Sequence, residues 1–486
     1  MSRLLGALLA AAAAVSFAPS PAPPEKAPEG RPLRLHYTPA QRDAGRYQYV
    51  PVSVPAGCTR LEVGYRYDKA DGGNAIDLGL FEPGPLDLGR AGFRGWSGGS
   101  REHVVVAVDE ATPGYWPGPL PAGEWQVVLG LYKVAPPGVD VDLTVGTSSA
   151  AAGPTPGLAP RPAEPLQQRG TLSWYSGDLH VHTLHSDGTE TAAEVARAAR
   201  AAGLEFIAIT DHNNTTHQLE RIEDPELLVI AGEEVTTPGG HANVWGLSGW
   251  RSEIDFRVLP GRERIDSLVE AAASRGALFS INHPFLECDG CSWEHAIPPG
   301  VAALEVWNGP LGPQTRAIAL WDRLLREGRR ITGVGSSDWH RPRAPLGRGS
   351  VRVRASELSR AAILRAIREG RVVVMGDART PAPGITVRAG GATAGIGDTL
   401  RLSAGQTVEV EVPAVVGGAA GGRAELVWNG EPAGEAPLST GAPARFRRAA
   451  TASGYLRVEL RAPDGGLVVL TNPVYLEVSG TARKIR

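Results

Sequence analysis

The stretch from about residue 171 to 377 most constrains the fold, because short apolar runs alternate there with segments of helical periodicity. The runs with strand character cover residues 205–210, 227–232, 277–282, 301–307 and 330–335. The helical segments cover residues 192–202, 265–275, 314–327 and 358–369. Serial β-α units of this kind build a parallel sheet, which is either closed into a barrel or doubly wound.

The chain on both sides of this stretch is typical of antiparallel β structure. Apolar residues alternate with period two in residues 61–67, 125–127 and 139–143, and again in residues 407–412 and 455–460. Gly- and Pro-rich turns separate these runs, and residues 149–170 are rich in Pro, Ala and Gly without periodicity. We therefore expect a β-sandwich over residues 31–148, a linker over 149–170, the β-α domain over 171–377 and an immunoglobulin-like β-sandwich over 380–480.

The N-terminus predicts export to the periplasm or the medium. Arg3 precedes an apolar run over residues 4–15, and Ser16 and Ala18 place small residues at the −3 and −1 positions of a cleavage site. We expect residues 1–18 to be a signal peptide. No other stretch approaches the roughly 18 apolar residues of a membrane span, so no span is expected after signal removal.

Composition excludes several classes of protein. The 486 residues are 42% hydrophobic and 21% charged, which is ordinary for a globular chain, and the net charge of −3 gives no specific signal for nucleic acid. Three cysteines are too few for a disulfide scaffold. Cys288 and Cys291 form a lone C-x-x-C, for which a local disulfide is favoured over a redox or zinc site. The oligomeric state is left open.

Candidate metal ligands gather at the ends of the predicted strands. Nine of the 11 histidines lie between His180 and His340. The period-two spacing of His180 and His182 points both rings to one side of a strand. The carboxyl ends of parallel strands meet at one rim, which is where such domains place their active sites. The ligand candidates at these ends are His180, His182, Asp187, His212, Glu234, His241, His283, Asp338 and His340.

This set predicts a hydrolytic metal site. Imidazole and carboxylate without thiolate favour Zn²⁺, Mn²⁺ or Fe²⁺, and nine ligands are too many for one ion, so two or three divalent ions are expected. Closely spaced ions can hold a hydroxide and clamp both the attacking and the leaving oxygen, which suits phosphate esters. No nucleophile elbow, P-loop or dinucleotide fingerprint is present.

The ordered motifs resemble a polymerase-and-histidinol-phosphatase (PHP) domain, and within it the CehA/McbA-type metallohydrolases. The matching motifs are H-x-H-T-x-x-S-D-G at 180–188, T-D-H at 210–212, G-x-E at 232–234, N-H-P at 282–284 and S-D-W-H at 337–340. The resemblance implies a distorted (β/α)7, TIM-like barrel between the two flanking sandwiches. Amidohydrolases, which also begin with H-x-H, often use a bridging Lys, and no Lys lies between Lys133 and Lys484.

The resemblance also implies how the ligands divide. His180, His182, Glu234 and Asp338 would hold a first ion. Glu234, His241 and His283 would hold a second, and Asp187, His212 and His340 a third. We expect Glu234, rather than the adjacent Glu233, to be the bridge, and Glu234, Asp338 and His340 to be the catalytic residues.

Other residues near the rim receive weaker predictions. Asn213, Asn308 and Arg341 are candidates for substrate contact, since an Arg can bind phosphate with two hydrogen bonds. His185, His217 and His295 are not expected to be ligands.

The sequence therefore favours an exported metal-dependent hydrolase, and most of all a phosphoesterase that attacks a small-molecule ester with a metal-bridging hydroxide. A first alternative keeps the metals but cleaves a carboxylic or carbamate ester or an amide. A second alternative is a non-enzymatic envelope module that binds a glycan or a protein through the flanking sandwiches.

Overall fold

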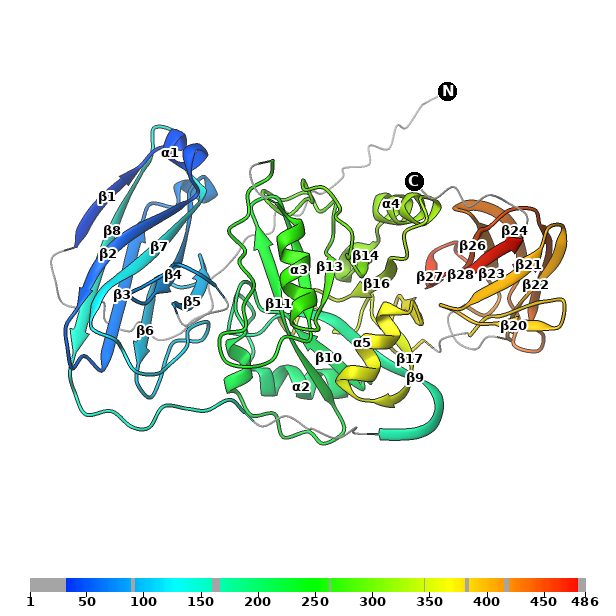
Figure 1. Cartoon of the computed structure of the whole chain (residues 1–486), viewed down its shortest axis with the longest axis horizontal. Coiled ribbons are helices and arrows are strands. Elements are labelled where there is room, and N and C mark those ends of the chain that lie inside the picture. Colours follow the sequence, from blue (N-terminus) through cyan, green and yellow to red (C-terminus); the bar gives the residue numbers. More distant parts are fainter. Residues whose placement is uncertain are drawn as a thin grey trace, which may run out of the picture.

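The computed structural model describes residues 32–88, 92–159, 167–261, 264–344, 346–380, 384–414 and 419–479. These residues form a multidomain, mostly β structure with few helices, in which an N-terminal β region, a central α/β region and a C-terminal β region follow one another (Figure 1). The predicted signal peptide, residues 1–18, lies outside the described residues. Among the residues that are described, no helix is long and apolar enough to cross a membrane.

Two four-stranded antiparallel sheets form the N-terminal region, in the orders β1-β8-β3-β6 and β2-β7-β4-β5. The period-two pattern places Leu61 and Val63 of one sheet against Ile76 and Leu78 of the other, and all four are fully buried in one core. The elements are β1 (Leu33–Tyr37), α1 (Pro39–Ala44), β2 (Tyr47–Val54), β3 (Arg60–Tyr67), η1 (Ala70–Gly72), β4 (Ala75–Phe81), β5 (Phe93–Gly98), β6 (His103–Ala107), β7 (Gly123–Lys133) and β8 (Val139–Ser148).

The central region begins with a long strand, β9, and contains the alternating elements that the sequence predicts. The predicted capping box is present, because Thr191 and Glu194 exchange side-chain and backbone hydrogen bonds at the start of the first helix. The elements are β9 (Gln167–Val181), α2 (Ala192–Ala201), β10 (Phe206–Ile209), η2 (Thr216–Leu219), β11 (Leu228–Thr237), β12 (Gly240–Trp245), α3 (Asp266–Ser274), β13 (Leu278–Ile281), β14 (Ala303–Asn308), η3 (Gly309–Leu311), β15 (Gly312–Pro313), α4 (Thr315–Arg326), β16 (Thr332–Ser336), β17 (Val351–Leu358), α5 (Arg360–Arg368) and β18 (Val372–Met375).

The pairing of these strands departs at one point from the parallel sheet that the serial β-α units predict. The strands β9, β10 and β11 are parallel, and so are β13, β14 and β16, but β12 is antiparallel to both of its neighbours. The reason is the turn at Gly239 and Gly240, where Gly240 has φ of +123°, so the chain folds back as a hairpin instead of crossing over through a helix. A TIM-like barrel is therefore not shown. The end of β9 pairs with the segment that follows β16 through an isolated parallel bridge between Val181 and Trp339.

The C-terminal region continues the central sheet. Strand β18 pairs with β27, and this sheet runs on through β26, β23 and β24, while a separate four-stranded sheet has the order β20-β19-β22-β25. The elements are β19 (Thr386–Ala389), β20 (Ala392–Ala394), β21 (Thr399–Ser403), β22 (Gln406–Val412), β23 (Arg423–Trp428), β24 (Glu431–Pro437), β25 (Ala444–Ala450), β26 (Gly454–Arg461), β27 (Leu467–Thr471) and β28 (Val474–Ser479).

A buried ion pair joins this region to the central one. Arg457 of β26 donates from Nη2 to Oδ2 of Asp322 in α4 at 2.7 Å and from Nε to Oδ1 at 3.0 Å, and Tyr455 donates to the same carboxylate at 2.8 Å. Two parallel bonds between a guanidinium and a carboxylate fix their relative orientation. The C-terminal region is thus held against α4, the helix that follows β14 and β15 in the chain.

Candidate metal centre

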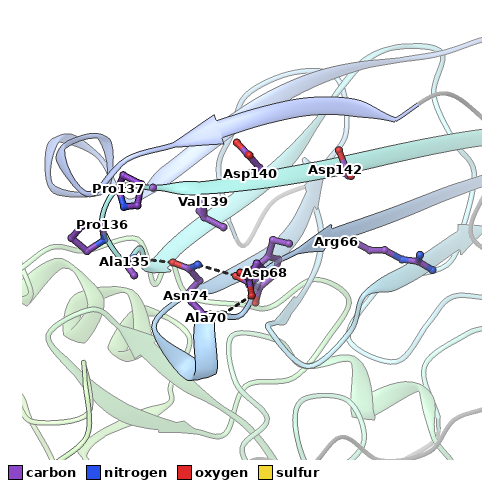
Figure 2. Close-up of a pocket in the computed structure, with 12 residues that line it drawn as sticks. Arg66, Asp68, Ala70, Asn74, Ala135, Pro136, Pro137, Val139, Asp140 and Asp142 are labelled. Atoms are coloured by element: carbon purple, nitrogen blue, oxygen red, sulfur yellow. Dashed lines mark hydrogen bonds between the residues drawn. The ribbon is translucent and has the colours of Figure 1, made fainter.

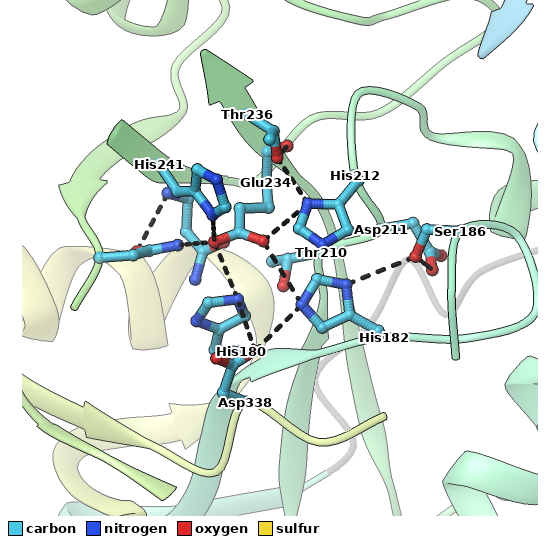
Figure 3. A network of polar contacts seen from close by, with 12 residues as sticks. His180, His182, Ser186, Thr210, Asp211, His212, Glu234, Thr236, His241 and Asp338 are labelled. Atoms are coloured by element: carbon cyan, nitrogen blue, oxygen red, sulfur yellow. Dashed lines mark hydrogen bonds and ion pairs between the residues drawn. The ribbon is translucent and has the colours of Figure 1, made fainter. Parts of the chain in front are cut away.

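The end of β9 carries the first two candidate ligands. His180 and His182 are two residues apart and fully buried, with ring centroids 5.0 Å apart (Figure 3). Both rings point toward Asp338, whose Oδ1 lies 3.3 Å from Nε2 of each histidine. The spacing expected from the sequence therefore gathers two imidazoles and a carboxylate from a distant strand end.

Glu234 of β11 is at the middle of the cluster, and only 1% of its side chain is exposed. Its two carboxylate oxygens lie within 3.5 Å of nitrogen atoms of five imidazoles. These are His212 at 2.9 Å, His180 and His283 at 3.2 Å, His241 at 3.3 Å and His182 at 3.5 Å. One carboxylate that reaches five rings has the geometry of a bridge between cations.

Two ligand candidates have unusual backbone conformations. Asp338, just after β16, has φ of +49°, and His283, just after β13, has φ of +21°. Positive φ is rare in residues other than glycine and costs energy, and it persists where the surrounding structure requires it. At both positions it accompanies a side chain that is directed into the cluster.

Asp187, His212 and His340 form the solvent-facing side of the cluster. Oδ1 of Asp187 lies 3.3 Å from Nε2 of His340 and 3.7 Å from Nε2 of His212. The side chain of Asp187 is 29% exposed, that of His340 24% and that of His212 23%. In contrast, His180 and His182 are fully buried. A substrate would therefore approach from this side.

The electrostatics of the cluster depend on burial and on the balance between rings and carboxylates. Burial and the positive charges of His340 and His212 lower the pKa of His182 to about 4. Burial alone would lower the pKa of His340, but the charge of Asp187 raises it to about 10. Burial would raise the pKa of Glu234, yet His180, His212 and His241 hold it well below its usual range. Carboxylates that stay ionised among many imidazoles are suited to holding cations.

The donor set fits divalent metal ions. Nε2 of His180, Nε2 of His182 and Oδ1 of Asp187 are buried and make no hydrogen bond among the described residues, which is costly unless another partner is present. Four groups have ligand atoms within 4.8 Å of one another: His182, Asp187, His212 and His340; His180, His182 and Asp338; His180, His283 and Glu305; and His212, Glu234 and His241.

These groups resemble the expected division of the ligands, with several differences. The expected third set, Asp187, His212 and His340, recurs with His182 added. His283, which the resemblance assigned with Glu234 and His241, groups instead with His180 and Glu305, although its Nε2 still lies 3.2 Å from Glu234. All nine predicted ligands are nevertheless brought together in one place.

Glu305 is a site residue that the sequence prediction missed. This buried carboxylate lies 3.3 Å from Nδ1 of His180 and accepts the backbone N–H of His283 at 2.7 Å. It also accepts hydrogen bonds from Ser336 and Asn308. The available signal was a lone Glu between Leu304 and Val306 in an otherwise apolar strand.

Asp211 and Asp178 form a supporting layer that was also missed. Asp211 accepts hydrogen bonds from the backbone and hydroxyl of Thr183 at 2.7 and 2.8 Å and from Ser186 at 2.8 Å, so it holds the loop that leads to Asp187. Asp178 accepts the backbone N–H of Ser337 at 3.0 Å and so positions the segment before Asp338. Burial raises the pKa of Asp178 to about 6.

The predicted substrate contacts stay predictions, and the structure gives two of them other partners. Both polar ends of the Asn213 amide bond to the backbone of Thr236, at 2.7 and 3.2 Å. Asn308 donates to Glu305 at 3.1 Å and to Oδ2 of Asp338 at 3.2 Å. Arg341 follows His340 directly and is partly exposed.

The three histidines that were not expected to be ligands are engaged elsewhere. His185 contacts Thr216 and Glu220, both at 2.8 Å, and Nε2 of His295 lies 2.9 Å from the Thr237 hydroxyl. Nδ1 of His217 lies 3.2 Å from Asp211. Cys288 and Cys291 are joined by a disulfide.

Fold and site together define an α/β domain with a cluster of His, Asp and Glu side chains that could bind metal ions. Residues 178–240 match the family model described as the PHP domain, so the chain contains a PHP domain. The match begins just before His180 and ends just before His241. The CehA/McbA subtype is not part of this finding.

Solved structures and curated proteins were also compared with the chain. One similar structure is a two-domain protein from Bacteroides vulgatus ATCC 8482 that is described as containing a predicted PHP-like metal-dependent phosphoesterase. The two sequences are 18% identical, the similarity covers 66% of this chain and 100% of that chain, and the TM-score is 0.37. Another, from Bifidobacterium adolescentis ATCC 15703, has a similar description as a metal-dependent phosphoesterase, with 18% identity, 35% and 90% coverage, and a TM-score of 0.25. No curated protein shows significant sequence similarity to the chain.

Proposed function

We propose that this protein is a metal-dependent phosphoesterase that acts on a small-molecule ester with two or three divalent cations. The observation that carries the proposal is the Glu234 carboxylate, which lies within 3.5 Å of five imidazole rings. A bridging carboxylate holds cations close enough to act on the same phosphate group. The PHP domain, found over residues 178–240, supports the same class.

Bound cations would supply an activated water molecule and neutralise charge on the phosphate oxygens. The chain's own residues hold and orient these groups. Asp338 contacts both His180 and His182 through one oxygen, and Asn308 fixes its other oxygen. Asp187, with His212 and His340, forms the exposed side on which the ester is expected to lie.

The finer expectations belong to this proposal as well. We propose that Glu234, Asp338 and His340 are the catalytic residues, and that the signal peptide directs export. The strands from β9 to β16 are proposed to curl into a distorted seven-stranded ring, which the Val181–Trp339 bridge supports.

The test is turnover by the purified protein, reconstituted separately with Zn²⁺, Mn²⁺ and Fe²⁺, on matched panels of phosphate monoesters, phosphate diesters and aryl carbamates. We expect metal-dependent release from phosphate esters and a loss of that activity in Asp338→Asn. Glu223→Gln serves as a control, because Glu223 is exposed and its ion-pair partner among the described residues is Arg221. Cleavage of carbamates without any cleavage of phosphates would overturn the phosphoesterase assignment.

A further inference from the structure

One sheet of the N-terminal region turns its outer face toward the central region. In β4, Ile76 and Leu78 point into the sandwich core, so Asp77 and Phe81 lie on the outer face. On this face Phe81 and Trp96 pack in one hydrophobic cluster with Phe256 of the central region, and the rings of Trp96 and Phe256 are 4.7 Å apart. The outer face is therefore a docked surface.

The same sheet touches two segments that carry metal-ligand candidates. Beyond the end of β5, the Ser100 hydroxyl donates to the carbonyl of Ser186, the residue before Asp187, at 3.2 Å. At the end of β7, Tyr132 lies so close to Gly290 that a Cβ there would be 2.8 Å from the phenol oxygen. Gly290 lies in the disulfide turn that follows His283. In the sheet order β2-β7-β4-β5, strand β4 lies between these two contacts.

Asp77 is the charged residue of β4 that faces this space. No hydrogen bond or ion pair of its carboxylate is found among the described residues, although the side chain is partly buried. Glycines surround it: a Cβ on Gly130 would lie 3.2 Å from Oδ2, and one on Gly98 or Gly99 would lie 3.7 Å from Oδ1. No side chain thus projects beside the carboxylate from these three positions, although the Trp96 ring lies 3.0 Å from the Cβ position of Gly130.

The pKa of Asp77 responds to burial and to nearby charges. Burial raises the pKa of Asp77 to about 7, while the charges of His212 and Arg46 act in the opposite direction. A partly buried carboxylate without a hydrogen-bond donor is unfavourable in the free protein, so a ligand that brings a donor gains from it.

We propose that Asp77 is a substrate-binding residue that accepts a hydrogen bond from a hydroxyl group on the alcohol part of the phosphate ester. The inference rests on the proposed function and names its substrate class, a phosphate ester of a polyol. The phosphate lies on the exposed side formed by Asp187, His212 and His340, and the polyol extends toward the sheet. The positive charge of Arg46, which lowers the pKa of Asp77, disfavours an ammonium group there.

A hollow elsewhere in the N-terminal region carries no such argument. It has a volume of about 470 Å³ and is lined by Tyr67, Asn74, Pro137 and Asp140 among others (Figure 2). Several of its polar groups already have hydrogen-bond partners in the protein. The Asn74 amide bonds to the backbone of Ala135 and Asp68, and Asp140 bonds to His36.

The experiment compares glycerol phosphate, propyl phosphate and phosphoethanolamine as substrates of the metal-loaded wild type, Asp77→Asn and Asp71→Asn. Asp71 is an exposed residue of the same sandwich and provides the matched control. We expect Asp77→Asn to raise KM for glycerol phosphate by roughly 10-fold, as loss of a hydrogen bond to a charged group does, with kcat nearly unchanged. Propyl phosphate and phosphoethanolamine should give the same KM in all three proteins.

Calorimetric binding of glycerol phosphate to the same proteins separates this inference from the proposed function. If wild type hydrolyses no phosphate ester, the proposed function fails, but tighter binding to wild type than to Asp77→Asn still supports the subsite. Equal KM changes for glycerol phosphate and propyl phosphate, or equal binding by wild type and Asp77→Asn, would overturn it. So would absence of both binding and turnover of glycerol phosphate, or a selective effect on phosphoethanolamine. Metal content and thermal unfolding of each variant show that it is folded and loaded.

Discussion

Oε2 of Glu234 lies 2.9 Å from Nδ1 of His212, and the same carboxylate reaches His241 through its other oxygen at 3.3 Å. His212 belongs to the exposed side of the cluster and His241 to its buried side. Glu234 therefore links two parts of the site that would hold different cations, and its loss should affect more than one of them.

We expect Glu234→Gln to bind fewer metal ions than wild type. Its activity should fall by more than the roughly 10–100-fold that is typical when a residue that hydrogen-bonds to a metal ligand is substituted. The amide keeps the shape of the side chain but removes the charge that the cations need. Metal analysis by mass spectrometry after gel filtration measures the ion count. Glu223→Gln should retain the wild-type count, and a full count in Glu234→Gln would contradict the bridging role.

Glu305 should be important for metal affinity although the sequence prediction did not include it. Its carboxylate contacts Nδ1 of His180 and holds the backbone of His283, so it orients two ligands at once. Glu305→Gln is expected to lower metal affinity or activity by about 10–100-fold. Titration of the metal-free variant with Zn²⁺ against a competing chelator measures this, and an unchanged affinity would show that Glu305 has no such role.

The sequence predicted the features that depend on interactions between residues close together in the chain. The helices at α2, α3, α4 and α5 agree with the prediction to within a few residues, because caps and periodicity are local signals. The nine ligand candidates could be listed because they lie in or close after predicted strands, and strand ends meet at one rim.

What the sequence could not predict depends on contacts between distant segments. Strand β12 pairs antiparallel with β11 and β13, which the β-α pattern did not indicate. Glu305 lies inside a buried strand, and its place between Leu304 and Val306 marks it as unusual without indicating that it contacts His180 and His283. The contact of Ser100 with Ser186, the residue before Asp187, arises only when the N-terminal sheet docks on the central region, and no sequence motif predicts that docking.

Removal of metal should lower both activity and stability. A ligand that binds only the folded state stabilises it by about 2.7 kcal/mol when its concentration is 100 times its Kd. Dialysis against a chelator should therefore abolish turnover and lower the midpoint of thermal unfolding, and adding Zn²⁺ or Mn²⁺ back should restore both. Calorimetry at constant pH measures the midpoint. An unchanged midpoint with and without chelator would argue against structural occupancy of the cluster.

Glu253 should make the stability of the protein fall as pH rises. Its carboxylate is fully buried and accepts hydrogen bonds from Trp116 at 2.7 Å and from Thr215 at 3.1 and 3.2 Å, but its Oε2 makes none among the described residues. Burial raises the pKa of Glu253 above its usual value. The folded state therefore binds the proton more tightly than the unfolded state, and the stability present below the unfolded pKa, about 4.3, is lost as pH rises through the folded pKa.

Substitution of Glu253 by Gln removes this titration and keeps an oxygen for Trp116 and Thr215. We expect Glu253→Gln to be more stable than wild type at pH 7, by on the order of 1 kcal/mol, because a buried charge is costly. The advantage should shrink toward pH 4.5, where the wild-type side chain is protonated in the folded state. Urea unfolding of both proteins between pH 4.5 and 8 measures this difference, with Glu223→Gln as the exposed control. A gap between wild type and Glu253→Gln that stays constant across this range would show that the buried carboxylate does not change its protonation on unfolding.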